Sequence, residues 1–498
     1  MSTLDIPGYD VWGRVGEGGM SEVWLAKHRA LAVPVIVKTL RAALQTGPDA
    51  TDRVLSEARL MARVSNPRIV RAYDAGTTGT PPLPYLVQEY VDGLDLAEID
   101  RRRRKALGVG LPLWLVCLVM RDVTEGLRAA HQAGVIHRDL KPSNIFGAAD
   151  SGVRLGDFGI AVARTEEQLV SDSAGTLKFM APEQLRGGEL GRFTDVWGAA
   201  ATACDLRYGH TPFRSSEHVL DPASPPDLPP PRSPAEAYFQ EVLRTMLAKD
   251  RAGRPADMAV PMHHFAMLKS AVPAPRLAVV RPEESTLQVG PIRLRMRVGD
   301  IATAEADAIV SSANYLMRMA TGVGAALRER GGASIEEEAV RDGERPLGSC
   351  VRTGAGTLRA KHVFHAVSAW NEVSCVGRAF MRALLLADEH RCARVAVPAL
   401  GTGAAKIGTE MCAAAMCSAL RWHVLLGGTP IREVTVYLDS VARLKKFVAI
   451  AEEIFLADTV VSRADVGLEA DPNADAEAPT CVNAESVAVD VADAGSEA

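Results

Sequence analysis

The chain has 498 residues, 47% hydrophobic and 23% charged, which suits two or three domains at about 100–200 residues each. The net charge of −5 gives no basic excess for nucleic acid, and no apolar run reaches the roughly 18 residues that cross a membrane. Eight cysteines without a CxxC pair or zinc-like spacing argue against disulfides and structural metal, so we expect a cytoplasmic protein with no membrane or nucleic-acid partner.

Five short β-type runs and one helical pattern make up the first part of the chain. The helical pattern spans about residues 49–64, and from residue 113 to about 267 the pattern is mainly helical. A small β-rich lobe followed by a larger helical lobe is therefore predicted. The β-type runs lie at residues 11–15, 22–28, 33–40, 69–75 and 85–90.

Two Pro-rich segments interrupt these patterns, at residues 221–234 and 272–282. The first predicts an exposed loop within the helical lobe and the second an interdomain linker. After Arg463 the chain has no Lys or Arg, while Asp and Glu recur among small residues, which predicts a disordered acidic tail over residues 458–498.

One local run, residues 101–105 (RRRRK), is strongly basic. We interpret it as the solvated end of a helix, with contact to an acidic partner or substrate as the alternative.

Several motifs together carry the parts that phosphoryl transfer needs, namely phosphate cradle, metal ligands and a base for the acceptor hydroxyl. Residues 16–23 (GEGGMSEV) form a glycine loop between two β runs, and alone they would be an ordinary hairpin turn. Lys38 follows on the next strand and Glu57 on the helix after it, where the acid can position the amine. The specific signals are HRDLKPSN at 137–144, DFG at 157–159 and APE at 181–183.

These residues resemble the eukaryotic-type protein kinase family, in its bacterial Ser/Thr branch, over residues 9–268. The resemblance implies ATP and Mg²⁺ as cofactors and protein Ser/Thr as substrate. It implies Asp139 as catalytic base, Lys141 at the γ-phosphate, Asn144 and Asp157 as Mg²⁺ ligands, and Lys38 held by Glu57. The implied ATP-binding residues are Gly16, Glu17, Gly18, Gly19, Val23, Lys38, Glu89, Val91 and Asp95.

Family position also assigns structural roles. Asp195 matches an aspartate that braces the catalytic loop, and Arg254 matches the partner of Glu183. Two departures occur: Ser21 replaces the third glycine of the loop, and Ile36 stands where an alanine commonly roofs the adenine. The bulkier Ile36 leaves a pseudokinase scaffold as the alternative to an active kinase.

Arg138 precedes the catalytic base, a position from which an Arg commonly binds a phosphate on the activation segment. We therefore predict autophosphorylation on the hydroxyls of that segment, at Thr165, Ser171 or Ser173.

Short β runs alternate with helices from about residue 287 to 457, which predicts a mostly parallel sheet. Two glycine loops follow strand ends, at residues 322–324 and 401–403, where backbone N–H groups suit a diphosphate. Tight turns alone would also explain such glycines.

This segment resembles the macro domain family through GDI at 299–301, SSAN at 311–314, the two glycine loops and the VFH strand at 363–365. The resemblance implies binding of ADP-ribose or of ADP-ribosylated protein. The first Asn of the family's pair is Ser311, Met317 and Arg318 precede the first loop, and Gly324 stands where hydrolysing members commonly carry an aspartate. We favour binding, with hydrolysis as the alternative. The implied ligand residues are Asp300, Ile301, Asn314, Gly322, Val323, Gly324, Gly401, Thr402 and Gly403.

The sequence thus predicts a multidomain chain: a protein-kinase-like α+β bilobal domain (9–268), a linker (269–286), a three-layer α/β/α macro-like domain (287–457) and the disordered acidic tail.

Overall fold

The computed structural model describes residues 4–17, 21–40, 55, 58, 61–79, 82–147, 152–158, 177–272, 274, 277, 279–283, 285–370 and 373–456. The predicted disordered tail and most of the predicted helix at 49–64 lie outside these residues.

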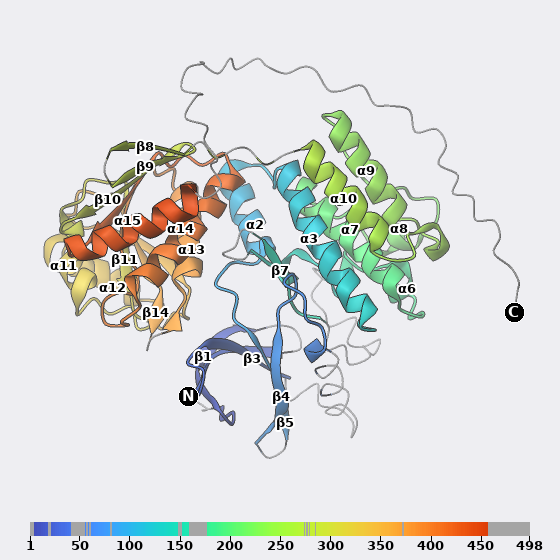
Figure 1. Ribbon diagram of the computed structural model, residues 1–498, viewed down its shortest axis with the longest axis horizontal. Helices are drawn as coiled ribbons and strands as arrows, with labels where there is room; N and C mark the ends of the chain where they lie inside the picture. Colours follow the sequence, from blue (N-terminus) through green and yellow to red (C-terminus); the bar gives the residue numbers. More distant parts are fainter. Residues whose placement is uncertain are drawn as a thin grey trace, which may run out of the picture. The chain divides into compact units, whose positions relative to one another are not determined.

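An antiparallel sheet of five strands forms the first lobe, in the order β1-β2-β3-β5-β4 (Figure 1). Val35 and Val37 on β3 are fully buried in the lobe's core. Because side chains alternate along a strand, Ile36 and Lys38 face the opposite side of the sheet. The five predicted β runs are confirmed as β1 (Tyr9–Glu17), β2 (Ser21–His28), β3 (Pro34–Leu40), β4 (Ala72–Thr78) and β5 (Leu83–Glu89).

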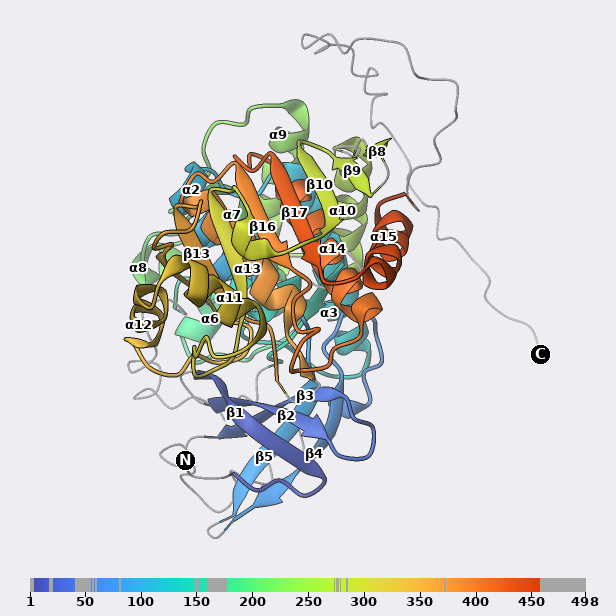
Figure 2. The same cartoon turned by 90° about the vertical axis from the view of Figure 1, so that its left-hand side faces the viewer.

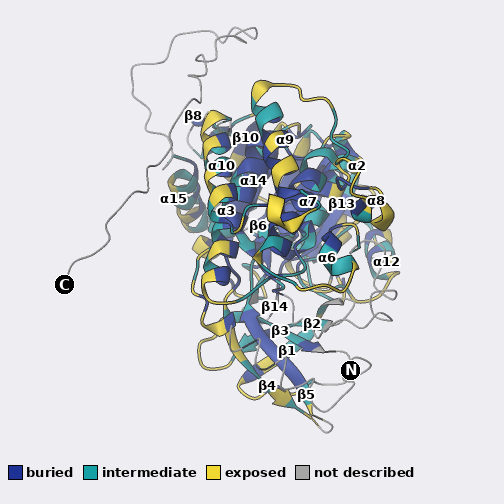
Figure 3. Ribbon diagram, turned by 90° about the vertical axis from the view of Figure 1, so that its right-hand side faces the viewer, coloured by how far each residue is buried: buried dark blue, intermediate teal, exposed yellow. Residues whose placement is uncertain are grey.

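The second lobe is helical and is built around α3 (Leu113–Gln132), against which α7 and α10 pack. The middle of α3 and of α7 is buried on almost every side, so both are core helices (Figure 3). A short hairpin, β6 and β7, carries the residues between the catalytic motifs. The elements are α2 (Leu96–Leu107), α3, η2 (Pro142–Asn144), β6 (Ile145–Gly147), β7 (Val153–Leu155), α6 (Pro182–Leu185), α7 (Arg192–Tyr208), α8 (Ser216–Leu220), α9 (Pro234–Met246), η3 (Arg251–Gly253) and α10 (Ala259–Ala271).

The basic run lies in the last turns of α2, and its interpretation as a solvated helix end is wrong. Arg103 is buried, and Arg102 and Arg104 are largely covered; only Arg101 and Lys105 are exposed. Their partners are described below.

The second domain contains an eight-stranded sheet in the order β12-β13-β11-β16-β17-β10-β9-β8. Its five central strands, β13 to β10, run parallel, as predicted, and β12, β9 and β8 add antiparallel edges. The strands are β8 (Val279–Glu283), β9 (Thr286–Val289), β10 (Ile292–Val298), β11 (Ala308–Ala313), β12 (Cys350–Gly354), β13 (His362–Val367), β16 (Arg394–Pro398) and β17 (Glu433–Leu438).

Helices cover both faces of this sheet and give three layers (Figure 2). One face is covered by α11 (Gly322–Gly331) and α12 (Ser334–Val340), and the other by α13 (Val376–Glu389), α14 (Thr409–Leu426) and α15 (Val441–Leu456). Smaller elements are η4 (Ile301–Thr303) and the hairpin β14 (Ala369–Trp370) and β15 (Val373–Ser374). Strand β8 and the start of β9 lie inside the predicted linker, so the sheet begins before residue 287.

Among the described residues, no helix has both the length and the apolar character required to cross a bilayer.

Candidate functional site

The catalytic loop is held in place by a buried carboxylate on α7. Asp195 accepts hydrogen bonds from the backbone N–H groups of His137 and Arg138, both at 2.8 Å, and lies 2.7 Å from His131 Nε2. Arg138 has φ 65°, a strained conformation for a residue with a side chain. The contacts of Asp195 hold that conformation, and its predicted bracing role is confirmed.

Asp139 lies at the centre of a short polar network. Lys141 Nζ lies 2.9 Å from its Oδ2, and Asn144 Nδ2 donates to its carbonyl oxygen at 2.7 Å. Because this contact commits the nitrogen of the Asn144 amide, its Oδ1, which accepts a long hydrogen bond from Ser143 Oγ at 3.4 Å, is the amide atom left to face a cation. The loop thus brings together the predicted base, the predicted phosphate-binding lysine and one predicted metal ligand.

Asp157 supplies the second predicted metal ligand and pairs with Lys38 of β3. Its φ is 53°, again in the left-handed region, and the next side chain, Phe158, is buried against His137 at 4.6 Å between ring centroids. Burial lowers the pKa of Lys38 to about 8. Two oxygen donors, from Asn144 and Asp157, fit the preference of Mg²⁺ for few protein ligands beside phosphate oxygens.

The predicted adenine- and ribose-binding residues follow β5. Glu89 ends the strand, the carbonyl of Val91 accepts from Gly93 N at 2.9 Å, and Asp95 caps α2 by accepting from Glu98 N at 2.8 Å. Val23 pairs with Lys38 across β2 and β3. Val23 is therefore the cross-strand neighbour of Lys38.

Several predicted residues belong to parts of the chain that the structure does not describe. Gly16 and Glu17 end β1, but Gly18, Gly19 and Glu57 lie outside the described residues, as do Thr165, Ser171 and Ser173.

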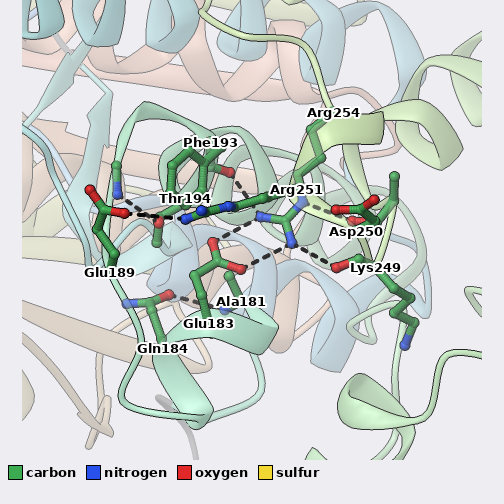
Figure 4. A network of polar contacts seen from close by, with 12 residues as sticks. Ala181, Glu183, Gln184, Glu189, Phe193, Thr194, Lys249, Asp250, Arg251 and Arg254 are labelled. Atoms are coloured by element: carbon green, nitrogen blue, oxygen red, sulfur yellow. Dashed lines mark hydrogen bonds and ion pairs between the residues drawn. The ribbon is translucent and has the colours of Figure 1, made fainter.

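The APE motif is tied to the rest of the helical lobe by Arg254 (Figure 4). Its guanidinium binds both carboxylate oxygens of Glu183, at 2.8 and 3.0 Å, and also the carbonyl of Phe193 at 3.1 Å. The predicted Glu183–Arg254 partnership is confirmed. Gln184 was missed: its side chain accepts from Ala181 N and donates to Arg138 O at 2.8 Å, linking this motif to the catalytic loop. No sequence signal indicated this role of Gln184, because its contact with Arg138 joins residues 46 positions apart that meet only in the folded chain.

The predicted ADP-ribose residues gather at one edge of the second sheet. Strands β10, β17, β16 and β11 are parallel neighbours, so their carboxyl ends meet at that edge. Asp300 and Ile301 follow β10, Asn314 follows β11, and the 401–403 loop follows β16. Gly401 N donates to Ser312 Oγ at 3.4 Å, which joins two of these loops.

The first glycine loop is the N-terminal turn of α11. Gly322, Val323 and Gly324 begin the helix after Thr321, whose side chain makes no capping bond, so their N–H groups are available to an anion. A Cβ on Gly324 would lie 3.2 Å from Met319 Cα, so a larger residue there would require Met319 to shift by a few tenths of an ångström. Met317 is fully buried and does not fill the loop.

Two of the predicted ligand residues already have protein partners. Asp300 caps η4 through Ala302 N and pairs with Arg330 at 3.1 Å. The amide of Asn314 both accepts from Arg318 N and donates to Arg318 O, at 3.2 and 3.3 Å. Binding adenine or ribose through these side chains would require exchange of those contacts.

The chain thus combines a two-lobed domain that carries Asp139 and Asp157 with a separate three-layer α/β/α domain. This combination defines a kinase joined to a macro domain. Sequence comparison agrees: the family model "Protein kinase domain" matches residues 9–266 and "Macro domain" matches residues 310–416. Because the first match spans more than half of the chain, the protein belongs to the protein kinase family.

Similar curated proteins are bacterial kinases. Serine/threonine-protein kinase PknB of Mycobacterium tuberculosis is 36% identical over 231 residues, 44% of this chain and 36% of PknB. PknL of Mycobacterium bovis is 32% identical over 283 residues, 54% of this chain and 69% of PknL. The chain therefore spans only about a third of PknB. A crystal structure of the Mycobacterium tuberculosis PknI kinase domain is 27% identical with a TM-score of 0.45, covering 54% of this chain and 98% of that domain.

Proposed function

We propose that the chain is an ATP- and Mg²⁺-dependent protein serine/threonine kinase that phosphorylates its own activation segment. The observation that carries this proposal is the network of Asp139, Lys141 and Asn144 beside the Lys38–Asp157 ion pair. It supplies a base, two cations and two metal-binding oxygens within one site.

In this proposal the carboxylate of Asp139 orients the acceptor hydroxyl and takes its proton. Lys141, held at 2.9 Å from that carboxylate, faces the transferred phosphate and offsets its developing charge. Asn144 and Asp157 would hold Mg²⁺ against the phosphates, and Lys38 would bind their oxygens. Lys141 two residues after the base favours Ser/Thr over Tyr as acceptor.

We further propose that the macro domain binds ADP-ribose or ADP-ribosylated protein and does not hydrolyse it. Gly324 stands where hydrolysing members commonly carry an aspartate, so this position offers no carboxylate to activate water.

The kinase proposal is tested by incorporation of labelled phosphate from ATP and Mg²⁺ into the whole chain and a basic protein substrate. The wild-type protein is expected to incorporate phosphate. Asp139→Asn is expected to lower the rate of incorporation by at least about 100-fold, the lower end of the contribution of a general base. No labelling in either protein would favour a pseudokinase scaffold, and nucleotide affinity would then show whether Ile36 closes the pocket. Release of free ADP-ribose from a modified protein would contradict the binding-only proposal.

A further inference from the structure

The segment that follows β5 caps a helix of the macro domain. The carboxylate of Asp92 accepts hydrogen bonds from the backbone N–H groups of Gly377 and Arg378, both at 2.9 Å. These are the first-turn amides of α13, whose own N-cap residue, Cys375, makes no side-chain capping bond. Because helix N-termini need such acceptors, α13 obtains its cap from the kinase domain.

A second contact runs in the other direction. Arg378 Nε donates to the carbonyl of Gly93 at 2.9 Å, and its guanidinium lies 5.9 Å from the ring of Tyr90. Tyr90 OH in turn donates to Asp92 Oδ1 at 3.3 Å. The chain from Tyr90 to Gly93, which includes the proposed adenine-binding residue Val91, is therefore held from outside by α13.

Helix α2 adds an ion-pair ladder to this contact. Arg382 of α13 binds both oxygens of Glu98, at 2.9 and 2.7 Å, and both side chains are largely covered. Burial opposes ionisation of Glu98, but the hydrogen bond and charge of Arg382 outweigh it and lower its pKa to about 2. Glu389 at the other end of α13 accepts from Arg102 at 2.8 Å and from Lys105 at 2.6 Å.

The basic run thus contacts an acid of the same chain. Arg103, the buried member, donates to the carbonyl of Gly427 at 2.6 Å. These contacts place α2 and α13 side by side.

Apolar contacts extend this interface to the first lobe. Cys375 is buried in one cluster with Leu25 of β2, and Ile36, Tyr90 and Leu347 pack against that cluster. Ile36 is the residue that stands at the predicted adenine roof. The macro domain therefore packs on residues that border the proposed nucleotide site.

The same helix start is linked to the second glycine loop. Gly401 N donates to Ser312 Oγ at 3.4 Å, Ser312 Oγ lies 3.3 Å from Ser368 Oγ, and Ser368 O accepts from Cys375 N at 2.7 Å. A Cβ on Gly401 would lie 3.0 Å from the Cβ of Ala369, so the 401–403 loop is in direct contact with the start of β14.

We propose that the N-terminus of α13 is a regulatory joint through which the macro domain sets how tightly the kinase holds nucleotide. This inference rests on the proposed kinase function. When α13 holds the segment from Tyr90 to Asp95 in place, nucleotide binding no longer has to order that segment. Contact between the macro domain and the kinase domain therefore favours nucleotide binding. A ligand in the 401–403 loop acts on the same helix start, and nucleotide and ligand then strengthen each other's binding reciprocally.

The test is the dissociation constant of Mg·ADP for the full chain, measured by calorimetry. Arg382→Glu places two acids together and is expected to weaken Mg·ADP binding by about fivefold or more, the lower range of known couplings. The exchanged pair, Glu98→Arg with Arg382→Glu, is expected to restore part of the lost affinity, because the new arginine also faces Arg102, which donates to Glu98 at 3.0 Å in the wild type. Arg443→Glu is the matched control, because Arg443 pairs with Asp439 of its own domain at 2.7 Å and is partly exposed.

Unchanged affinity in Arg382→Glu would overturn the joint, while absence of Mg·ADP binding in folded wild type would instead overturn the kinase proposal. If Arg382→Glu does not fold, Gly377→Ala gives the same comparison, because the added Cβ lies 3.0 Å from both Asp92 O and Oδ2.

Saturating ADP-ribose should tighten Mg·ADP binding in wild type and leave Arg382→Glu unchanged. Weaker Mg·ADP binding would indicate competition for one site and contradict the coupling.

Discussion

Lys38 on β3 forms an ion pair with Asp157, so the cation of the first lobe meets the predicted metal ligand of the second. The Lys38 side chain is 13% exposed and that of Asp157 is 41% exposed, so the amine is largely covered while the acid keeps part of its surface open. One amine therefore lies where it can contact both this acid and a bound phosphate.

Replacing Lys38 by Met should abolish phosphate transfer while the fold is kept. Loss of one preorganised charge at such a site lowers turnover by about 100-fold or more. Phosphate incorporation measures the loss, and thermal unfolding reports the fold. Lys27→Met on β2 is the control, because Lys27 pairs with Pro34 at the far end of the same strand pair. A Lys38→Met protein with more than half the wild-type activity would contradict the assigned role.

Removing Glu183 and Arg254 together should cost less stability than the sum of the two single removals. The Arg254 side chain is fully buried and that of Glu183 is 11% exposed. Removing one partner leaves an uncompensated buried charge, so Arg254→Met should lower the free energy of unfolding by about 3–5 kcal/mol. The double variant with Glu183→Gln should cost less than the sum of the single changes. Urea unfolding of the four proteins gives the cycle, and strictly additive costs would contradict the coupling.

The sequence predicted the catalytic loop, the APE partner and both glycine loops because each depends on short motifs with unusual residues at fixed spacing. Arg138 and Asp157 adopt positive φ within such motifs. The strands of the first lobe were predicted from short β-type runs, and the structure has a strand at or overlapping each of the five runs.

Predictions were wrong where a residue's partner is distant in the sequence or where a local signal pointed to another structure. Residues 101–105 look like any solvated helix end, since the partner of Arg102, Glu389, is 287 positions away. Strand β8 falls inside the predicted linker for a different reason: the Pro-rich segment at residues 272–282 overlaps it, and proline argues against a strand, although β8 pairs with its immediate neighbour β9.

The macro domain should lose stability in mild acid because of His365. Its ring is buried, Nε2 lies 2.9 Å from Thr353 Oγ1, and burial lowers its pKa from 6.5 to about 4. Between pH 6.5 and 4 the unfolded chain binds a proton that the folded chain does not, so stability falls as pH falls through this window. The contribution is up to about 3 kcal/mol.

Chemical unfolding followed from pH 7 to 4 measures this slope. His365→Gln removes the titrating group and should flatten the curve in that window, whereas His263→Gln, an exposed ring in the kinase domain, should not. Equal slopes in wild type and His365→Gln would contradict the assignment.

Gly403→Leu should remove ADP-ribose binding without disturbing the fold. A Cβ at Gly403 meets nothing within 4 Å, and its backbone is not in the left-handed region, so the chain can accept a side chain there. The leucine would instead occupy the space above the loop in which the proposed diphosphate lies. Calorimetry with ADP-ribose should show at least about tenfold weaker binding, a loss of about 1.4 kcal/mol. Thermal unfolding should match wild type, because the side chain meets solvent in the free protein. Unchanged affinity with an intact fold would place the ligand elsewhere, since any diphosphate held by the 401–403 amides must pass over this residue.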